Sequence, residues 1–186
     1  MTDDELADRV RALLGGSVSC SVSYGTVTAD VPRERWVEAA SAVRDTLGMV
    51  FFDLLTAVDV LEDGFDVVVR LWAPADRHGL LLRTRCPRDD ARVASLTSVF
   101  AGAAWHERQV WEMFDIDVDG HPGLTPLLLP PGFEGHPMRK EFVLAARVAK
   151  AWPGAKDPGE SDSDLATGRP RRRLQPPGVP RPGSRP

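Results

Sequence analysis

Three histidines are the first residues that could do chemistry. His106, His121 and His136 are evenly spaced within residues 105–144, and the fourth histidine, His78, lies upstream. Imidazole nitrogens are common zinc ligands, but a helical site needs a spacing such as HxxxH that turns two ligands toward one ion. His121 and His136 each stand between Gly and Pro. We therefore favour a rigid turn with its imidazole hydrogen-bonded to backbone, with a metal site as the alternative.

The charged pair Glu107-Arg108 is the second candidate. The apolar spacing of a predicted helix places Glu107 on its buried face, together with Phe100, Ala104, Trp111 and Phe114. Glu107 and His106 could form a general acid–base pair. No nucleophile elbow, cofactor-binding glycine loop or second paired carboxylate accompanies them. We favour a structural role, in which the carboxylate and the guanidinium bind each other or a partner.

Two further charged groups follow this helix. Asp115, Asp117 and Asp119 alternate as on one face of a strand, without the closing Glu of a twelve-residue calcium loop. We expect a solvated acidic strand face there. Arg139-Lys140-Glu141 follows an apolar loop and has the same structural character as Glu107-Arg108.

The segment between these groups is rich in glycine and proline, which prevents any regular element longer than a turn. It is nevertheless apolar at Ile116, Val118, Leu124, Leu127, Leu128, Leu129, Phe133 and Met138. An extended segment with this composition has to bury against something. We expect the chain's own body to cover part of it and a partner to cover the rest.

The elements that must position these residues lie upstream. Acidic residues and a Thr2 or Asp3 cap predict a first helix that ends at Gly15-Gly16, and Pro32 opens a second helix that ends at Gly48. Alternating and β-branched residues predict strands at 18–23, 26–31, 50–60, 65–72 and 80–86. Asp89-Asp90 then cap a predicted helix with Val93, Leu96 and Phe100 on one face, followed by a short helix over 105–114.

This order predicts an α+β fold: a small mixed, mainly antiparallel sheet with helices on one face, plus an extended Pro/Gly-rich segment that wraps a partner. We expect an α/β domain at 1–114, a partner-binding segment at 115–150 and a disordered Pro/Arg-rich tail at 151–186. A helical turn is possible at 145–151.

Composition limits the function classes. The net charge is -4; seven basic and four acidic residues after position 150 make the tail +3 and leave -7 for residues 1–150, a poor match for nucleic acid. Cys20 and Cys86 have no metal-ligand spacing, and no apolar run reaches the roughly 18 residues of a membrane span. The acidic start MTDDELADRV predicts no signal or transit peptide.

The charged blocks carry a family resemblance. Three blocks follow one another in the chain: Trp105-x-Glu107-Arg108-Gln109-x-x-Glu112-Met113-Phe114-Asp115-Ile116, Gly120-His121-Pro122-x-Leu124 and Gly135-His136-Pro137-Met138-Arg139-Lys140-Glu141-Phe142. Together they resemble the C subunit of NADH-quinone oxidoreductase, respiratory complex I. The family pattern is W-x-E-R-E-x-x-D-[ML]-F-G-I, G-H-P-x-L-R-R-I-L and G-H-P-L-R-K-D-[FY]. Gln109 replaces its third Glu, Asp115 its Gly, and Thr125-Pro126 its Arg-Arg.

The resemblance implies a cofactor-free structural subunit of the cytoplasmic arm of a proton-translocating enzyme, with no catalytic, cofactor or metal site of its own. Flavin and iron–sulfur clusters would belong to partners, chiefly the quinone-site B and D subunits and the iron–sulfur I subunit. The chain would be peripheral, on the cytoplasmic side of the cell membrane, and bind no nucleic acid. The partner interface is predicted at Glu107, Arg108, Trp111, Phe114, His121, Leu124, His136, Arg139 and Lys140.

Other functions stay open at this point. The departures from the family pattern suggest the equivalent subunit of a shortened complex I relative or a membrane-bound hydrogenase, which would use ferredoxin, deazaflavin or hydrogen instead of NADH. Two hypotheses come from other classes: a metal-dependent hydrolase that uses the three histidines, and an adaptor whose Arg171-Arg172-Arg173 tail binds an anionic surface.

Overall fold

A five-stranded sheet forms the centre of the computed structural model, which describes residues 2–143. Its strands are β1 (Ser19–Ser23), β2 (Thr26–Asp30), β3 (Phe51–Asp59), β4 (Phe65–Ala73) and β5 (His78–Cys86). Their order across the sheet is β1-β2-β5-β4-β3. Only the β2–β5 pair is parallel. The predicted mixed, mainly antiparallel sheet and both of its hairpins are confirmed.

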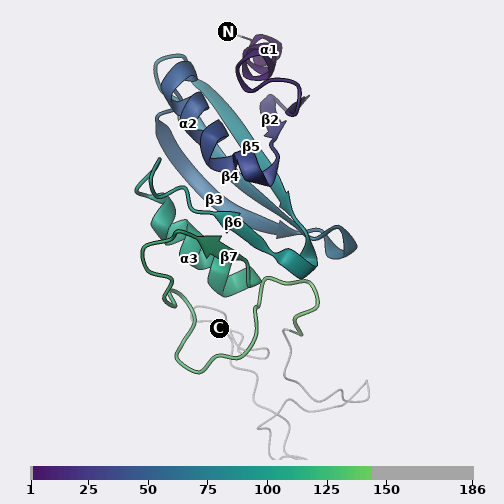
Figure 1. Cartoon of the computed structure of the whole chain (residues 1–186), viewed down its shortest axis with the longest axis vertical. Helices are drawn as coiled ribbons and strands as arrows, with labels where there is room; N and C mark the ends of the chain where they lie inside the picture. Colours follow the sequence, from purple (N-terminus) through teal and green to yellow (C-terminus); the bar gives the residue numbers. More distant parts are fainter. Residues whose placement is uncertain (1, 144–186) are drawn as a thin grey trace, which may run out of the picture. The chain divides into compact units, whose positions relative to one another are not determined.

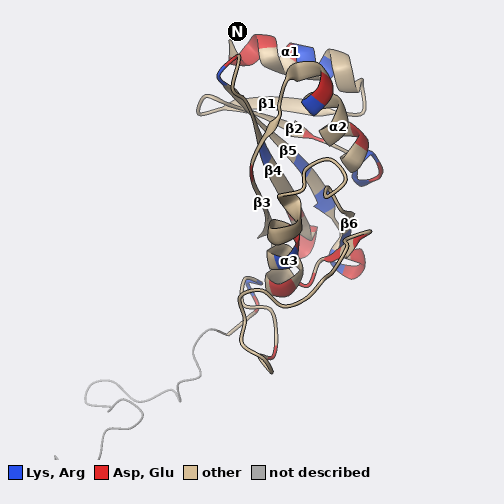
Figure 2. Cartoon of the chain, turned by 90° about the vertical axis from the view of Figure 1, so that its left-hand side faces the viewer, with Lys and Arg blue, Asp and Glu red and all other residues tan. Residues whose placement is uncertain are grey.

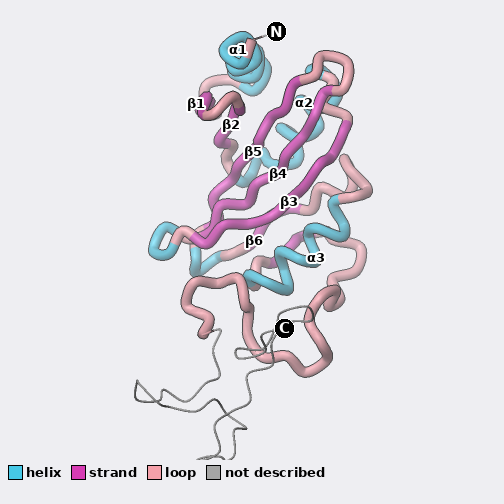
Figure 3. Tube along the Cα trace, turned by 180° about the vertical axis from the view of Figure 1, so that it is seen from behind, coloured by secondary structure: helices cyan, strands magenta, loops and turns pink. Residues whose placement is uncertain are grey.

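Two helices cover one face of this sheet. Helix α1 (Asp3–Leu14) begins at Thr2, whose hydroxyl accepts the Glu5 N–H while the Glu5 carboxylate accepts the Thr2 N–H. Its acidic first turn is red in Figure 2 and suits the positive end of the helix dipole. After the 3-10 turn η1 (Arg33–Arg35), helix α2 (Trp36–Leu47) crosses the strands, and the view from behind shows the opposite face uncovered (Figure 3).

Strand alternation decides which side chains form the core. On β4, Phe65, Val67, Val69 and Leu71 are buried and pack in one cluster with Leu80 and Leu82 of β5 and the apolar faces of α1 and α2. The intervening residues point to the uncovered face. Because successive side chains of a strand point to opposite faces, every second residue contributes to one apolar layer that packs against the helices.

The helix predicted from Asp89 to Phe100 is wrong. This segment forms the 3-10 turn η3 (Arg88–Asp90), strand β6 (Arg92–Ala94) and turns. β6 pairs in parallel with β7 (Asp117–Asp119), so that Val93 lies opposite Val118. Val93, Leu96 and Phe100 are spaced by three and four residues, as on one face of a helix. The backbone of residues 92–94 instead forms its hydrogen bonds with the distant strand β7.

Helix α3 (Ala103–Phe114) runs beside the edge strand β3 (Figure 1). His106 Nδ1 lies 3.3 Å from Leu55 N and 3.1 Å from Leu55 O, so its imidazole covers backbone groups of that strand. Phe114 meets Phe65 edge to face with ring centroids 6.3 Å apart. The short helix predicted over 105–114 is confirmed, and its last turn is fixed against the core.

The segment predicted at 115–150 is described only as far as residue 143, and its residues 117–119 pair with β6 in the body. The helical turn predicted at 145–151 and the tail at 151–186 lie outside the described residues. Within residues 2–143, no helix is both long and apolar enough to cross a bilayer.

We predict that Gly64→Ala lowers the free energy of unfolding by about 3 kcal/mol. Gly64 has φ +95°, where side chains are strained, and a Cβ there would overlap the carbonyl oxygen of Cys86. Gly16→Ala is the control, because its methyl group would meet nothing within 4 Å. Urea unfolding of both variants tests this; equal stability would contradict the described turn.

Candidate functional site

The residues singled out from the sequence meet at the last turn of α3 and the segment 120–143, named here the C-terminal loop. In Figure 1 this loop passes beneath α3. None of its residues is fully buried by the rest of the described chain. Leu128 and Phe133 are 60% and 42% exposed, and Met138 and Val143 are exposed as well. The chain's own body therefore covers only part of this apolar loop.

The C-terminal loop completes the end of α3. The last carbonyl groups of a helix have no partner within it. Here the Trp111 carbonyl accepts the Asp115 N–H at 3.0 Å, and the Met113 carbonyl accepts the Met138 N–H at 3.1 Å. His136 Nδ1 donates to the Glu112 carbonyl at 2.9 Å, and Arg139 Nε donates to the Phe114 carbonyl at 2.6 Å. The loop thus pairs the last three carbonyl groups of α3, and Asp115 pairs the one before them.

Glu112 holds the middle of the loop. Its carboxylate accepts the N–H groups of three consecutive residues: Leu128 at 2.8 Å, Leu129 at 2.9 Å and Leu127 at 3.2 Å. Burial would raise the pKa of Glu112, but these three N–H donors and the nearby Arg108 outweigh it and hold the pKa below its ordinary value. The sequence identified Glu112 only as part of a motif, and its role was missed.

Arg108 fastens the start of the loop. Its Nε donates to the Thr125 carbonyl and its Nη2 to the Pro126 carbonyl, both at 2.8 Å. Its guanidinium carbon also lies 5.3 Å from the centre of the Trp105 ring. The acceptors are backbone carbonyl oxygens, which every residue type has. These hydrogen bonds therefore do not depend on the family's Arg-Arg, which Thr125-Pro126 replaces here.

Of the two pairings proposed for Glu107 and Arg108, the bond to each other is wrong, and the bond to a partner stays a prediction. Glu107 is 1% exposed, and its carboxylate accepts the Ser95 hydroxyl at 2.7 Å and the Leu96 N–H at 2.6 Å. Neighbouring residues on a helix do not face each other, so Arg108 points outward to the loop. The buried position of Glu107 is confirmed. Its bonds bind the segment after β6, which explains part of why no helix forms there.

The histidines bind three separate pieces of backbone. His121 Nε2 donates to the Ala104 carbonyl at 3.0 Å, while its Nδ1 accepts the Gly123 N–H at 2.9 Å. His136 binds the end of α3, and His106 lies against β3. The predicted turns with backbone-bound imidazoles are confirmed for His121 and His136. Among residues 2–143, no group of three or more His, Cys, Asp or Glu side chains is placed to hold a metal ion.

A second set of contacts, missed from the sequence, holds the end of the loop. Asp59 at the end of β3 accepts the Lys140 N–H at 2.8 Å and the Leu61 N–H at 2.9 Å, and it pairs with Arg88. Arg88 also binds the Glu141 carboxylate at 2.9 Å. Burial would raise the pKa of Asp59, but the two N–H donors and Arg88 hold it below its ordinary value. Strand alternation, which places Asp59 on the core side, was the available signal.

Phe65 links the two sets of contacts. The guanidinium carbons of Arg88 and Arg139 lie 4.7 Å and 5.3 Å from the centre of its ring. Arg139 also binds the Asp115 carboxylate at 3.0 Å. Asp115 has φ +58°, a left-handed conformation that explains the Gly of the family pattern at this position. In this chain its carboxylate gains Arg139 as a partner.

The predicted interface residues differ in exposure. Glu107 and Phe114 lie in the chain's own interior, so they support the surface and do not form it. Lys140 is exposed, and the others are half-buried: Arg108, Trp111, His121, Leu124, His136 and Arg139. Asp117 and Asp119 are exposed on β7 on either side of buried Val118, which confirms the acidic strand face for these two residues. The prediction is wrong for Asp115, which ends α3 in a left-handed conformation and pairs with Arg139.

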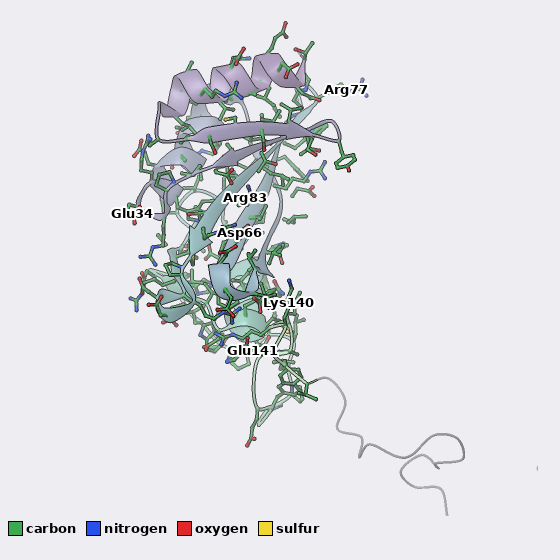
Figure 4. All side chains as sticks on the ribbon, turned by 90° about the vertical axis from the view of Figure 1, so that its right-hand side faces the viewer. Glu34, Asp66, Arg77, Arg83, Lys140 and Glu141 are labelled. Carbon is green, nitrogen blue, oxygen red and sulfur yellow. The ribbon has the colours of Figure 1, made fainter. Side chains whose placement is uncertain are left out.

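A hollow lined by residues of β2, β4 and β5 has a different character. Its charged residues pair across strands: Arg83 with Asp30 at 2.5 Å, and Arg85 with Asp66 at 2.7 Å. Asp66 and Arg83 lie on the strands, whereas Lys140 and Glu141 lie at the C-terminal loop (Figure 4). Each of these arginines has a carboxylate partner on a neighbouring strand. We therefore interpret the charged residues of this hollow as cross-strand ion pairs that stabilise the sheet.

We predict that acidification releases the loop from Glu112. Because the pKa of Glu112 is lowered by folding, its contribution to stability is complete above its ordinary pKa of 4.5 and is lost as pH falls through the lower, folded value. The amide NMR signals of Leu127–Leu129 should shift in this acidic range and stay unchanged from pH 5 to 7. Glu112→Gln should remove the step. An identical step in that variant would assign it to another group, such as Asp59.

The chain is similar to proteins of one respiratory family. A family model described as respiratory-chain NADH dehydrogenase, 30 Kd subunit, matches residues 29–148. The C subunit of NADH-quinone oxidoreductase from Brucella abortus (strain 2308) is 34% identical over 149 residues, covering 77% of this chain and 73% of the relative. The same subunit of Brucella ovis matches with the same identity and coverage.

Two solved structures have a similar fold. A trypsin-resistant fragment of Nqo5 superposes with a TM-score of 0.57 at 26% identity, covering 67% of this chain and 100% of that one. A chain of the membrane-bound sulfane sulfur reductase, an archaeal respiratory membrane complex, gives a TM-score of 0.65 at 22% identity over 77% of this chain and 86% of that one. With the family match across β2 to the C-terminal loop, the chain belongs to the family of the 30 kDa subunit of the respiratory-chain NADH dehydrogenase.

Proposed function

We propose that this chain is a structural subunit of a proton-translocating NADH-quinone oxidoreductase and carries no redox cofactor itself. The observation that carries the proposal is the C-terminal loop, which is apolar and exposed yet held in one conformation by α3 and Asp59. Several exposed apolar side chains on one loop of a single chain are typical of a protein–protein interface. Membership in a family of respiratory-enzyme subunits supports the same role.

The fastened loop suits assembly for an energetic reason. A loop that became ordered only on binding would lose conformational entropy at that moment, which weakens association. Glu112, Arg108 and Arg139 hold the backbone in place within the single chain. More of the free energy of apolar burial is then available for binding a neighbour.

The neighbours in this proposal are the quinone-site B and D subunits and the iron–sulfur I subunit. Flavin and iron–sulfur clusters lie in partners, and this chain helps to assemble the electron path to quinone on the cytoplasmic side of the cell membrane. Its contact with the membrane is through the complex. Two observations support this proposal. The chain belongs to the family, and His106, His121 and His136 each form a hydrogen bond with a backbone group of this chain.

A second candidate is the equivalent subunit of a related membrane complex that uses ferredoxin, deazaflavin or hydrogen as its electron donor. This candidate is retained because the chain has a fold similar to that of a chain of an archaeal respiratory membrane complex. The departure at Thr125-Pro126 does not discriminate, because Arg108 binds the backbone there. The electron donor therefore has to be identified in the assembled enzyme.

We predict that a tagged chain, purified from gently solubilised native membranes, brings flavin- and iron–sulfur-containing subunits and NADH:quinone activity with it. The same membrane partners without NADH oxidation would establish the second candidate. Purification of the chain alone would refute both.

Leu128→Asp in the tagged chain should lower the recovery of partners at least tenfold, because burial of a leucine contributes about 1.5–3 kcal/mol and 1.4 kcal/mol is tenfold. Val22→Asp is the matched control, since Val22 is exposed on β1. Equal recovery with both variants would exclude the loop as the interface.

A further inference from the structure

A pocket lies between the final turn of α3 and the C-terminal loop. Trp111 and Glu112 form its helical side, and Pro126, Leu129, Phe133 and His136 form its loop side. Its volume is about 260 Å³. Pockets that hold small-molecule ligands measure roughly 300–1,000 Å³, so this one suits a protein side chain better than a cofactor.

The ionised groups in the wall already have partners. The Glu112 carboxylate is occupied by three backbone N–H groups. Asp115 binds Arg139 at 3.0 Å and lies 3.5 Å from His136, which donates its other nitrogen to the Glu112 carbonyl. A cationic side chain would compete with Arg139 and His136 for Asp115, and an anionic one would be repelled by the two carboxylates, whereas an apolar side chain would leave all of these pairs intact.

The loop side of the wall is largely apolar, although Gly132 and Gly135 add backbone N–H groups to it. Three prolines, Pro126, Pro130 and Pro131, contribute to it and have no backbone N–H. Phe133 and Trp111 supply aromatic surface. Such a wall gives a polar group little to bind and gives an apolar side chain a large contact area.

The pocket exists before anything binds. Arg108 holds the Pro126 carbonyl, and Glu112 holds the Leu129 N–H. The Phe133 N–H donates to the Pro130 carbonyl at 3.1 Å, and its ring stacks on Phe142 with centroids 6.0 Å apart. Exposed Leu128 belongs to the same loop segment, and Phe133 is itself partly exposed. A fixed pocket within an exposed apolar surface has the form of an interface hot spot.

We propose that this pocket receives one apolar side chain from an adjoining subunit of the oxidoreductase. The inference rests on the proposed function and deepens it, because it names the part of the loop that anchors the partner and the chemistry of the anchor. The paired charges of the wall and its proline backbone select an aliphatic or aromatic residue.

Photo-crosslinking in the assembled complex tests the occupant. p-Benzoylphenylalanine replaces Phe133 in the tagged full-length chain, with the same replacement at Val22 as the control. We expect a crosslink from position 133 to an apolar residue of another subunit. A crosslink to residues 144–186 of this chain, to a charged residue, or to nothing would overturn the proposal. Recovery of the partners in the same sample would show that the proposed function still stands in that case.

A pocket-filling variant gives a second readout. Leu129→Trp keeps the backbone N–H that binds Glu112 and places a larger side chain in the pocket, so partner recovery should fall at least tenfold. The Leu127–Leu129 amide signals at neutral pH should stay dispersed, which separates a filled pocket from a lost loop. Tyr24→Trp, at a fully exposed turn, is the control for an added indole. Recovery equal to the unmodified chain would overturn the proposal.

Discussion

The end of α3 is the constraint on which the rest of the C-terminal region depends. A helix leaves its final carbonyl groups unpaired, and the sequence after Phe114 cannot continue the helix to pair them. The chain turns at Asp115, forms β7 and returns in the C-terminal loop, which supplies His136, Met138 and Arg139 to those carbonyls. The loop and the helix end thus stabilise each other.

The two glutamates of α3 hold different segments of the chain in place. Glu107 points inward and fixes the segment after β6, while Glu112 points toward the loop and collects three of its N–H groups. Both carboxylates are buried, and both are satisfied by neutral donors of this chain. Buried carboxylates are costly unless they are hydrogen-bonded. Each carboxylate thus holds backbone or side-chain groups of this chain in place.

Elements whose local pattern agrees with the tertiary structure were predictable from the sequence. Period-two alternation predicted the strands, helical spacing predicted α3 and the burial of Glu107, and Gly-His-Pro predicted backbone-bound imidazoles. The interface stays a prediction from exposure and family membership.

Segments whose structure depends on a distant contact were not predictable from the sequence. The spacing of Val93, Leu96 and Phe100 fits a helix, but Glu107 and the β6–β7 pairing select a strand followed by turns. The Asp59–Lys140 bond joins residues 81 positions apart. Strand alternation could have predicted that Asp59 is buried, but it could not have identified Lys140 as the partner. Glu112 was missed for a related reason, because its partners are backbone groups whose direction depends on the loop conformation.

Amide hydrogen exchange of the free chain at neutral pH tests most directly whether α3 holds the C-terminal loop before any partner binds. We expect slow exchange at Leu127, Leu128, Leu129, Met138 and Lys140, whose N–H groups bind Glu112, Met113 or Asp59. Exchange should be at least tenfold faster at Glu134 and Gly135, for which the described part of the chain shows no such bond. Uniformly fast exchange across residues 120–143 would contradict a loop held by α3 and would mean that it becomes ordered only in the complex.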